Sequence, residues 1–169
     1  MRVTVTGGAG FIGSHLVDRL LDAGHDVLCY DNVATGHMRF IEQASTSRRF
    51  SFVEGDTLDQ AALAQALRGT DLVFHLAANA DVRHGTDHPR KDLEQNTIAT
   101  FNVLEAMRGA GVRRIAFAST GSVYGEPAIF LDCSRIRALG WRPRLTIREG
   151  VVKTVDYLMA NTWLFDQRS

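Results

Sequence analysis

The residues best suited to chemistry in this chain are glycines that stand close together near its start. Residues 6–13 read TGGAGFIG, in which Gly8, Gly10 and Gly13 have the spacing G-x-G-x-x-G. A short apolar stretch typical of a buried strand precedes them, and a helical pattern follows at once. Backbone N–H groups at the start of a helix bind phosphate oxygens where no Cβ stands in the way. The stretch therefore predicts a turn that binds the pyrophosphate of a dinucleotide, and the alternative is a tight turn with a purely structural role.

Each glycine of the turn has a predicted task. We expect Gly7 to form the tight turn, Gly10 to let the backbone approach the ligand closely, and Gly13 to let the helix pack against the strand. Phe11 and Ile12 lie between these glycines at the predicted start of the helix, and they are candidate cofactor contacts.

An acidic residue follows the turn at the distance expected of a ribose ligand. Asp26 to Tyr30 form a predicted second strand that ends on Asp31, about 20 residues after the turn. The carboxylate of Asp31 is placed to accept hydrogen bonds from the adenosine ribose hydroxyls, and it would repel a 2′-phosphate. With strand, glycine turn, helix, strand and acid in this order, the chain is predicted to bind NAD rather than NADP.

Strands alternate with helices through the part of the chain that follows. Residues 50–54, 71–76 and 114–118 are predicted strands, and residues 59–69 and 89–110 have helical spacing. This alternation predicts an α/β fold: a doubly wound parallel sheet of the Rossmann type, with about five strands in the order 3-2-1-4-5.

Several local features refine these elements. Asp59 is the expected N-cap of its helix, a short helix is expected around residues 40–44, and His75 is expected to be packed in the core. The helix over residues 89–110 begins at Pro89 and carries four apolar residues on one side: Leu93, Phe101, Leu104 and Met107. Asp81, His84, Asp87 and His88 precede this helix, and we expect a solvated loop there rather than a metal site.

The composition sets limits on the class of protein. The chain has 169 residues, of which 45% are hydrophobic, and 19 basic residues balance 19 acidic ones. This balance predicts neither a nucleic-acid partner nor an acidic membrane surface. Cys29 and Cys133 are isolated, which predicts a reducing, cytoplasmic location. We expect no signal peptide and no membrane-spanning segment.

Six motifs in order resemble a known family. They are TGGAGFIG, YDN, GD, HLAA, Asn96 with NVLEA, and STGSVYG, all within residues 1–127. They resemble the N-terminal part of the extended short-chain dehydrogenase/reductases, and within these the NAD-dependent nucleotide-sugar epimerases and dehydratases of the UDP-glucose 4-epimerase type. The resemblance implies that Asp56 and Leu58 flank the adenine, and that Ser119 lies beside the nicotinamide. The other residues implied to lie at or behind the cofactor are Asn32, Ala77, Ala78, Asn79 and Asn96.

The resemblance does not extend to the whole catalytic apparatus. It implies that Thr120 binds the sugar hydroxyl that is oxidised. It also implies a Tyr-x-x-x-Lys motif one helix later, in which the tyrosine accepts the proton, but none of the three tyrosines here has a lysine four residues on. Tyr124 is a weaker candidate proton acceptor, because a phenol with a pKa of about 10 is a poor base without a nearby cation.

The end of the chain resembles the extreme C-terminal segment of the same family. Residues 131–143 have the pattern LD-x-S-R-x-x-x-LGW-x-P, and a predicted capping box at Thr146 and Glu149 starts a last helix. The resemblance implies that the middle of a typical member is missing. We expect a dinucleotide-binding domain over residues 1–127, and a segment over residues 128–169 that packs on it or on a partner subunit of a homo-oligomer.

Two functions are compatible with this pattern. The first is a protein that binds NAD, and possibly a nucleotide-sugar, with little or no turnover because the Tyr/Lys pair is absent. The alternative is an active NAD-dependent UDP-sugar 4-epimerase or dehydratase, which would use Thr120 and an unconventional base.

Overall fold

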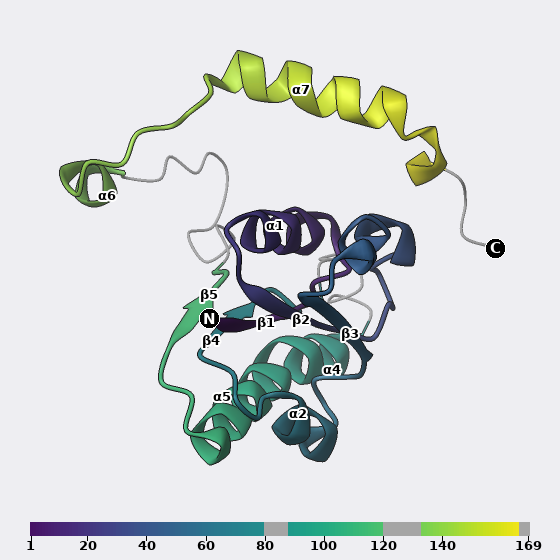
Figure 1. Cartoon of the computed structure of the whole chain (residues 1–169), viewed down its shortest axis with the longest axis vertical. Helices are drawn as coiled ribbons and strands as arrows, with labels where there is room; N and C mark the ends of the chain where they lie inside the picture. The colour runs from purple at the N-terminus through teal and green to yellow at the C-terminus, as the bar shows by residue number, and fades with distance from the viewer. Residues whose placement is uncertain (80–87, 120–132, 166–169) are drawn as a thin grey trace. The chain divides into compact units, whose positions relative to one another are not determined.

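A sheet of five parallel strands organises the first part of the chain (Figure 1). The strands are β1 (Arg2–Thr6), β2 (Asp26–Asp31), β3 (Phe50–Glu54), β4 (Leu72–His75) and β5 (Ile115–Phe117). Their order across the sheet is β3-β2-β1-β4-β5, and every neighbouring pair is parallel. The predicted doubly wound sheet is therefore confirmed, with β4 and β5 shorter at both ends than the sequence indicated.

The computed structural model describes residues 1–79, 88–119 and 133–165. It divides into two compact units, Met1–Ser119 and Thr120–Ser169. The predicted domain boundary after residue 127 lies outside the described residues.

Helices cover both faces of the sheet in the first unit (Figure 1). One face carries α1 (Phe11–Asp22) and two short 3₁₀ turns, η1 (Met38–Ile41) and η2 (Ala44–Thr46), which replace the single short helix expected there. The opposite face carries α2 (Gln60–Ala66) and α5 (Ala99–Ala110). This arrangement buries both faces of the central strands, as a parallel sheet requires.

The core has one apolar cluster on each face of the sheet. The α1 side is built on Val3, Val5, Val17, Val27 and Ile41. The α2–α5 side is built on Tyr30, Leu63, Leu67, Val73 and Val103. Asp59 caps α2 as predicted, since its Oδ1 accepts hydrogen bonds from two backbone N–H groups of the first turn at 3.1 and 3.0 Å.

The helical segment that begins at Pro89 contains a wide turn that the sequence did not indicate. α4 (Pro89–Asp92) continues into a π-helical stretch, η3 (Leu93–Ile98), which leads into α5. Of the four apolar residues expected on one side, Met107 is buried, whereas Leu93, Phe101 and Leu104 are exposed. Most of the expected apolar side is therefore exposed and does not face the sheet. The buried row of α5 runs through Ala99 and Val103, and Phe101 is turned about 200° round the axis from Ala99.

The second unit contains three helical elements within its described residues. They are α6 (Ser134–Ala138), α7 (Ile147–Ala160) and η5 (Thr162–Phe165). The predicted capping box is confirmed: the N–H of Thr146 donates to Glu149 Oε2 at 2.7 Å, and the N–H of Glu149 donates to Thr146 Oγ1 at 3.3 Å. α7 has no buried residue. The packing of this segment on the first unit or on a partner subunit stays a prediction.

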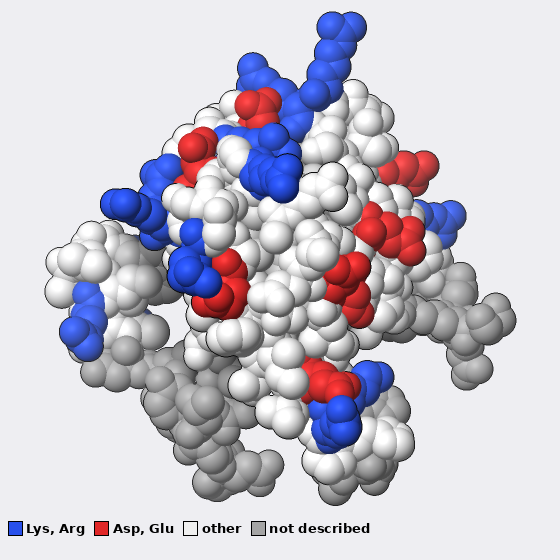
Figure 2. All heavy atoms as spheres, turned by 90° about the horizontal axis from the view of Figure 1, so that it is seen from below, with Lys and Arg blue, Asp and Glu red and all other residues white. Residues whose placement is uncertain are grey.

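Basic and acidic side chains are interspersed on the face drawn in Figure 2. Within the described ranges, no helix is both long and apolar enough to cross a membrane. The same residues include no group of three or more His, Cys, Asp or Glu side chains arranged to hold a metal ion. Asp81, His84 and Asp87, which precede α4 in the sequence, lie outside the described residues.

Candidate dinucleotide-binding site

The predicted site residues follow the carboxyl ends of the strands. The loops after β1, β2, β3 and β4 all leave the sheet at one edge, because the strands are parallel. β1 stands at the centre, with β2 on one side and β4 on the other. The chain order reverses at this point, and ligands of open α/β sheets bind in the crevice that such a reversal creates.

Gly7 occupies the sharpest part of the glycine turn. Its φ is 73°, in the left-handed region that side chains other than glycine rarely adopt. Its N–H donates to the carbonyl oxygen of Tyr30 at 2.9 Å. A Cβ at Gly7 would stand 2.7 Å from the backbone nitrogen of Ala77. Both the turn and the nearby loop after β4 therefore exclude any other residue here.

Gly13 and Gly10 differ in what a side chain would meet. A Cβ at Gly13 would overlap the carbonyl oxygen of Gly7 and would lie 2.8 Å from the Cα of Gly8. A Cβ at Gly10 would come only within 3.2 Å of the Gly7 oxygen. Gly13 thus brings the helix against the turn itself, where the prediction was packing against the strand, and Gly10 leaves more room at the start of the helix.

The start of α1 presents backbone donors beside apolar side chains. Gly10 is its N-cap and brings no side chain to satisfy the first N–H groups, which have no acceptor within the helix. Phe11 and Ile12 are 46% and 72% exposed. The Phe11 ring packs edge-on against Phe40 at a centroid distance of 6.1 Å. The start of this helix can therefore bind an anion, and the two apolar side chains can form one wall of the site.

Asp31 connects the end of β2 to the glycine turn. Its Oδ2 accepts a hydrogen bond from the N–H of Ala9 at 2.9 Å, and its Oδ1 accepts one from the N–H of Val33 at 2.8 Å. The residue is 8% exposed. Each carboxylate oxygen has a further lone pair, so Asp31 fixes the turn and can still accept bonds from a ligand.

Asn32 and Asp56 come together across the ends of β2 and β3. Asn32 Nδ2 donates to Asp56 Oδ2 at 3.0 Å, and the N–H of Leu58 donates to Asp56 Oδ1 at 2.8 Å. The Tyr30 hydroxyl donates to the Asp56 carbonyl oxygen at 3.0 Å. Burial, with smaller effects of Asp59 and Asp56, raises the pKa of Tyr30 to about 12. Tyr30 is therefore a neutral donor that supports this loop.

The loop after β4 is held by the helical segment behind it. The N–H of Asn79 donates to Asn96 Oδ1 at 2.8 Å, and Asn79 Nδ2 donates to Asp92 Oδ1 at 2.6 Å. The N–H of Ala77 makes a long contact of 3.5 Å with Thr6 Oγ1. Ala78 between them is exposed. The structure therefore places Ala77 beside the glycine turn and holds Asn79 against Asn96.

The last predicted residues follow β5. Ser119 is exposed just beyond the strand. Thr120 and Tyr124, the two catalytic candidates, lie outside the described residues.

A comparison with known families agrees with this geometry. Residues 3–136 match the NAD dependent epimerase/dehydratase family. The chain belongs to this family. The match covers every predicted cofactor residue, from Gly7 to Ser119.

The proteins to which this chain is similar include named enzymes, some of them with solved structures. UDP-glucose 4-epimerase of Mycolicibacterium smegmatis is 43% identical over 133 residues, which are 77% of this chain and 42% of the relative. A structure of UDP-glucose 4-epimerase from Thermus thermophilus in complex with NAD is 41% identical, with a TM-score of 0.65 over 72% of this chain and 38% of that one. DesIV, a dTDP-glucose 4,6-dehydratase from Streptomyces venezuelae with NAD bound, is 35% identical, with a TM-score of 0.72 over 77% of this chain and 42% of that one. The chain thus spans about two fifths of the length of these relatives.

Three supporting residues were missed at the level of sequence. Asn102 lies on the buried face of α5, and its Nδ2 donates to the carbonyl oxygens of Thr57 and Leu58 at 3.0 and 3.4 Å. Thr6 and Thr100 hold the ring of His75. A polar residue among the apolar positions of a helix is the signal that could have identified Asn102.

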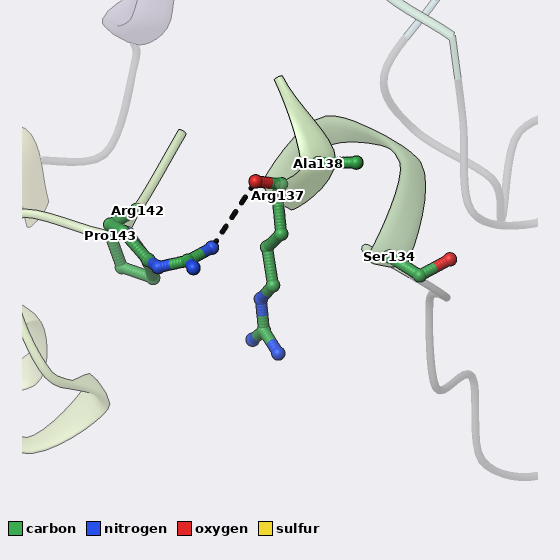
Figure 3. Close-up of a pocket in the computed structure, with 5 residues that line it drawn as sticks. All are labelled: Ser134, Arg137, Ala138, Arg142 and Pro143. Atoms are coloured by element: carbon green, nitrogen blue, oxygen red, sulfur yellow. Dashed lines mark hydrogen bonds between the residues drawn. The ribbon is translucent and has the colours of Figure 1, made fainter. Parts of the chain in front are cut away.

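The second unit has a shallow hollow of its own (Figure 3). Its volume is about 430 Å³, and it is lined by Ser134, Arg137, Ala138, Arg142 and Pro143. Arg142 Nη1 donates to the carbonyl oxygen of Arg137 at 3.3 Å. All five residues are exposed, so this hollow has the character of a solvated surface, and none of the predicted site residues lines it.

Proposed function

We propose that this chain binds NAD at the carboxyl ends of β1, β2 and β4. The turn from Gly7 to Gly13 and the start of α1 hold the pyrophosphate, and Asp31 accepts hydrogen bonds from the adenosine ribose. The observation that carries this proposal is the hydrogen bond from the N–H of Ala9 to the carboxylate of Asp31. Through this bond the expected ribose ligand lies directly beside the expected pyrophosphate-binding turn. The NAD complex of the Thermus thermophilus relative supports it.

Asp31 also favours NAD over NADP. A 2′-phosphate would place further negative charge against a carboxylate that is 8% exposed, where repulsion is weakly screened. The ribose 2′-hydroxyl instead donates a hydrogen bond to the carboxylate.

We further propose that nucleotide-sugars undergo little or no turnover on this chain. Hydride transfer from a sugar carbon to NAD requires a group that takes the hydroxyl proton. The chain holds no tyrosine with a lysine four residues later, and loss of an aligned base costs a factor of roughly 10² to 10⁴. Both cysteines are free, which suits the cytoplasmic location that we expect.

Two measurements on the purified chain test this function. NAD that co-purifies is released by denaturation and quantified enzymatically, and we expect a substantial fraction of the chains to carry it. The protein is then incubated with NAD and UDP-glucose or UDP-galactose, and we expect neither the other epimer nor a rise in NADH absorbance. Formation of the epimer would contradict the proposed lack of turnover and would favour the enzymatic alternative. A chain that neither carries nor takes up NAD would contradict the proposal as a whole.

A further inference from the structure

His75 is a buried ionisable residue that the proposed site does not use directly. It ends β4 and is 1% exposed. Its Nδ1 lies 2.6 Å from Thr6 Oγ1 of β1, and its Nε2 lies 3.1 Å from Thr100 Oγ1 of α5. The Phe117 ring of β5 lies 5.7 Å away, centroid to centroid. The imidazole therefore connects three strands of the sheet to the helix behind them.

The neighbours of the ring fix the direction of its hydrogen bonds. The Thr100 hydroxyl donates its hydrogen to the carbonyl oxygen of Asn96 at 2.6 Å. Since a hydroxyl has one hydrogen, Thr100 can only accept from His75 Nε2–H. A neutral imidazole carries one N–H, so Nδ1 is the acceptor and Thr6 is its donor.

The charge state of the ring agrees with these directions. Burial lowers the pKa of His75 to about 4. In the part of the chain that the structure describes, the ring makes side-chain hydrogen bonds with Thr6 and Thr100 and a ring contact with Phe117, and none of these three side chains is ionisable. A protonated ring would turn Nδ1 into a donor, and the Thr6 hydroxyl would then have to accept from it rather than donate to it.

The bonds continue from the ring to the cofactor side of the sheet. Thr100 holds the main chain of Asn96 within the π-helical stretch η3. The Asn96 side chain in turn accepts from the N–H of Asn79 at 2.8 Å. On the other side, Thr6 Oγ1 faces the N–H of Ala77 at 3.5 Å. Ala77 and Asn79, which lie in the first part of the loop after β4, are thus both connected to the same imidazole.

We propose that His75 is a positioning residue: as the neutral Nε2–H tautomer it ties Thr6 to Thr100, and so sets the place of residues 77–79 beside the glycine turn. This inference rests on the proposed NAD site for its functional consequence. Its structural part, a single tautomer linked to the loop after β4, stands apart from NAD binding and can be measured separately.

The test uses the full chain and two variants of one contact. Thr100→Val removes the hydroxyl but nearly preserves the shape of the side chain, and Thr100→Ser keeps the hydroxyl. Long-range ¹H–¹⁵N NMR spectra report the tautomer of His75, hydrogen exchange reports the amides of Ala77 and Asn79, and calorimetry reports the affinity for NAD. In the wild type between pH 6 and 8, we expect a neutral ring that carries its single hydrogen on Nε2.

In T100V we expect a changed tautomer equilibrium, roughly tenfold faster exchange at residues 77 and 79, and roughly tenfold weaker NAD binding. T100S should stay within about twofold of the wild type in all three.

An Nδ1–H tautomer, or a cationic ring at pH 7, overturns the proposal. A changed tautomer with unchanged exchange and affinity overturns the positioning role. A wild type that does not bind NAD contradicts the proposed function instead, and the exchange rates then decide the inference about His75. Should T100V fail to fold, the wild-type tautomer and T100S still decide it.

Discussion

The glycine turn and the C-terminal helix α7 differ in how fully their side chains are held by the rest of their unit. Around the turn, strand residues from Val3 to Thr6 are buried, and Asp31 is bonded through both carboxylate oxygens. In α7 no residue is buried, and five large apolar side chains are exposed: Ile147, Val151, Val152, Val155 and Met159. The difference teaches that hydrogen bonds and buried residues of the first unit hold the glycine turn in place, whereas within the second unit α7 relies on its cap and its own backbone bonds.

The largest effect in this comparison is expected at Gly13. Gly13→Ala should lower the free energy of unfolding by roughly 3 kcal/mol, because the new Cβ overlaps backbone atoms of the turn rather than a side chain that can move. The matched control is Gly109→Ala in α5, where a Cβ meets nothing within 4 Å. That control should raise stability by about 0.5 to 1 kcal/mol. Denaturant unfolding followed by circular dichroism measures both, and equal effects would contradict the close packing of the turn.

The pH dependence of stability tests the sheet next to the turn. The pKa of His75 is lowered to about 4 by burial, from about 6.5 in the unfolded chain. Between these values the unfolded chain binds a proton that the folded chain does not, so stability falls as pH falls through this window. We expect His75 to contribute about 2 to 3 kcal/mol that is fully present above pH 6.5 and lost near pH 4. Unfolding titrations of the wild type and His75→Gln measure this, and an equal pH dependence in both would refute it.

Asp31 should control the affinity for NAD more than the stability of the fold. Asp31→Asn keeps the size of the side chain but removes the charge and one of the acceptors that hold Ala9 and Val33. We expect NAD to bind roughly 10 to 100 times more weakly, and the preference for NAD over NADP to shrink. Calorimetry with both dinucleotides measures this. A variant that binds NAD like the wild type would show that the carboxylate has a structural role alone.

The smallest effect is expected in α7. Thr146→Ala removes the hydroxyl that accepts from the N–H of Glu149, which should destabilise this helix by about 1 kcal/mol and leave NAD binding unchanged. The control is Thr154→Ala, since Thr154 lies within the helix and its hydroxyl donates to the Gly150 carbonyl oxygen of the same helix. Alanine there should maintain or increase helicity. If T146A weakened NAD binding more than T154A, the two regions would not be independent.

The sequence predicted those parts of the site that depend on local geometry. The tight turn at Gly7, the cap at Asp59 and the capping box at Thr146 each follow from a few consecutive residues, and the structure has them. Gly13 is closely packed, but against the turn rather than against the strand. The order of the strands followed from the alternation of elements and the rules of handedness.

Other features could not be predicted because distant segments determine them. The π-helical stretch η3 and the exposure of Phe101 depend on how α5 meets the sheet. Asn102 and Thr100 have functions only through partners 45 and 25 residues away, Thr57 and His75. Helical spacing alone does not distinguish the face that packs on the sheet from an exposed apolar face.

Calorimetric titration of the wild-type chain with NAD, and in parallel with NADP, tests the central claim most directly. We predict saturable binding of one NAD per chain, with much weaker binding of NADP. Absence of heat up to millimolar NAD, or equal affinity for the two dinucleotides, would contradict an NAD site built on the glycine turn and Asp31.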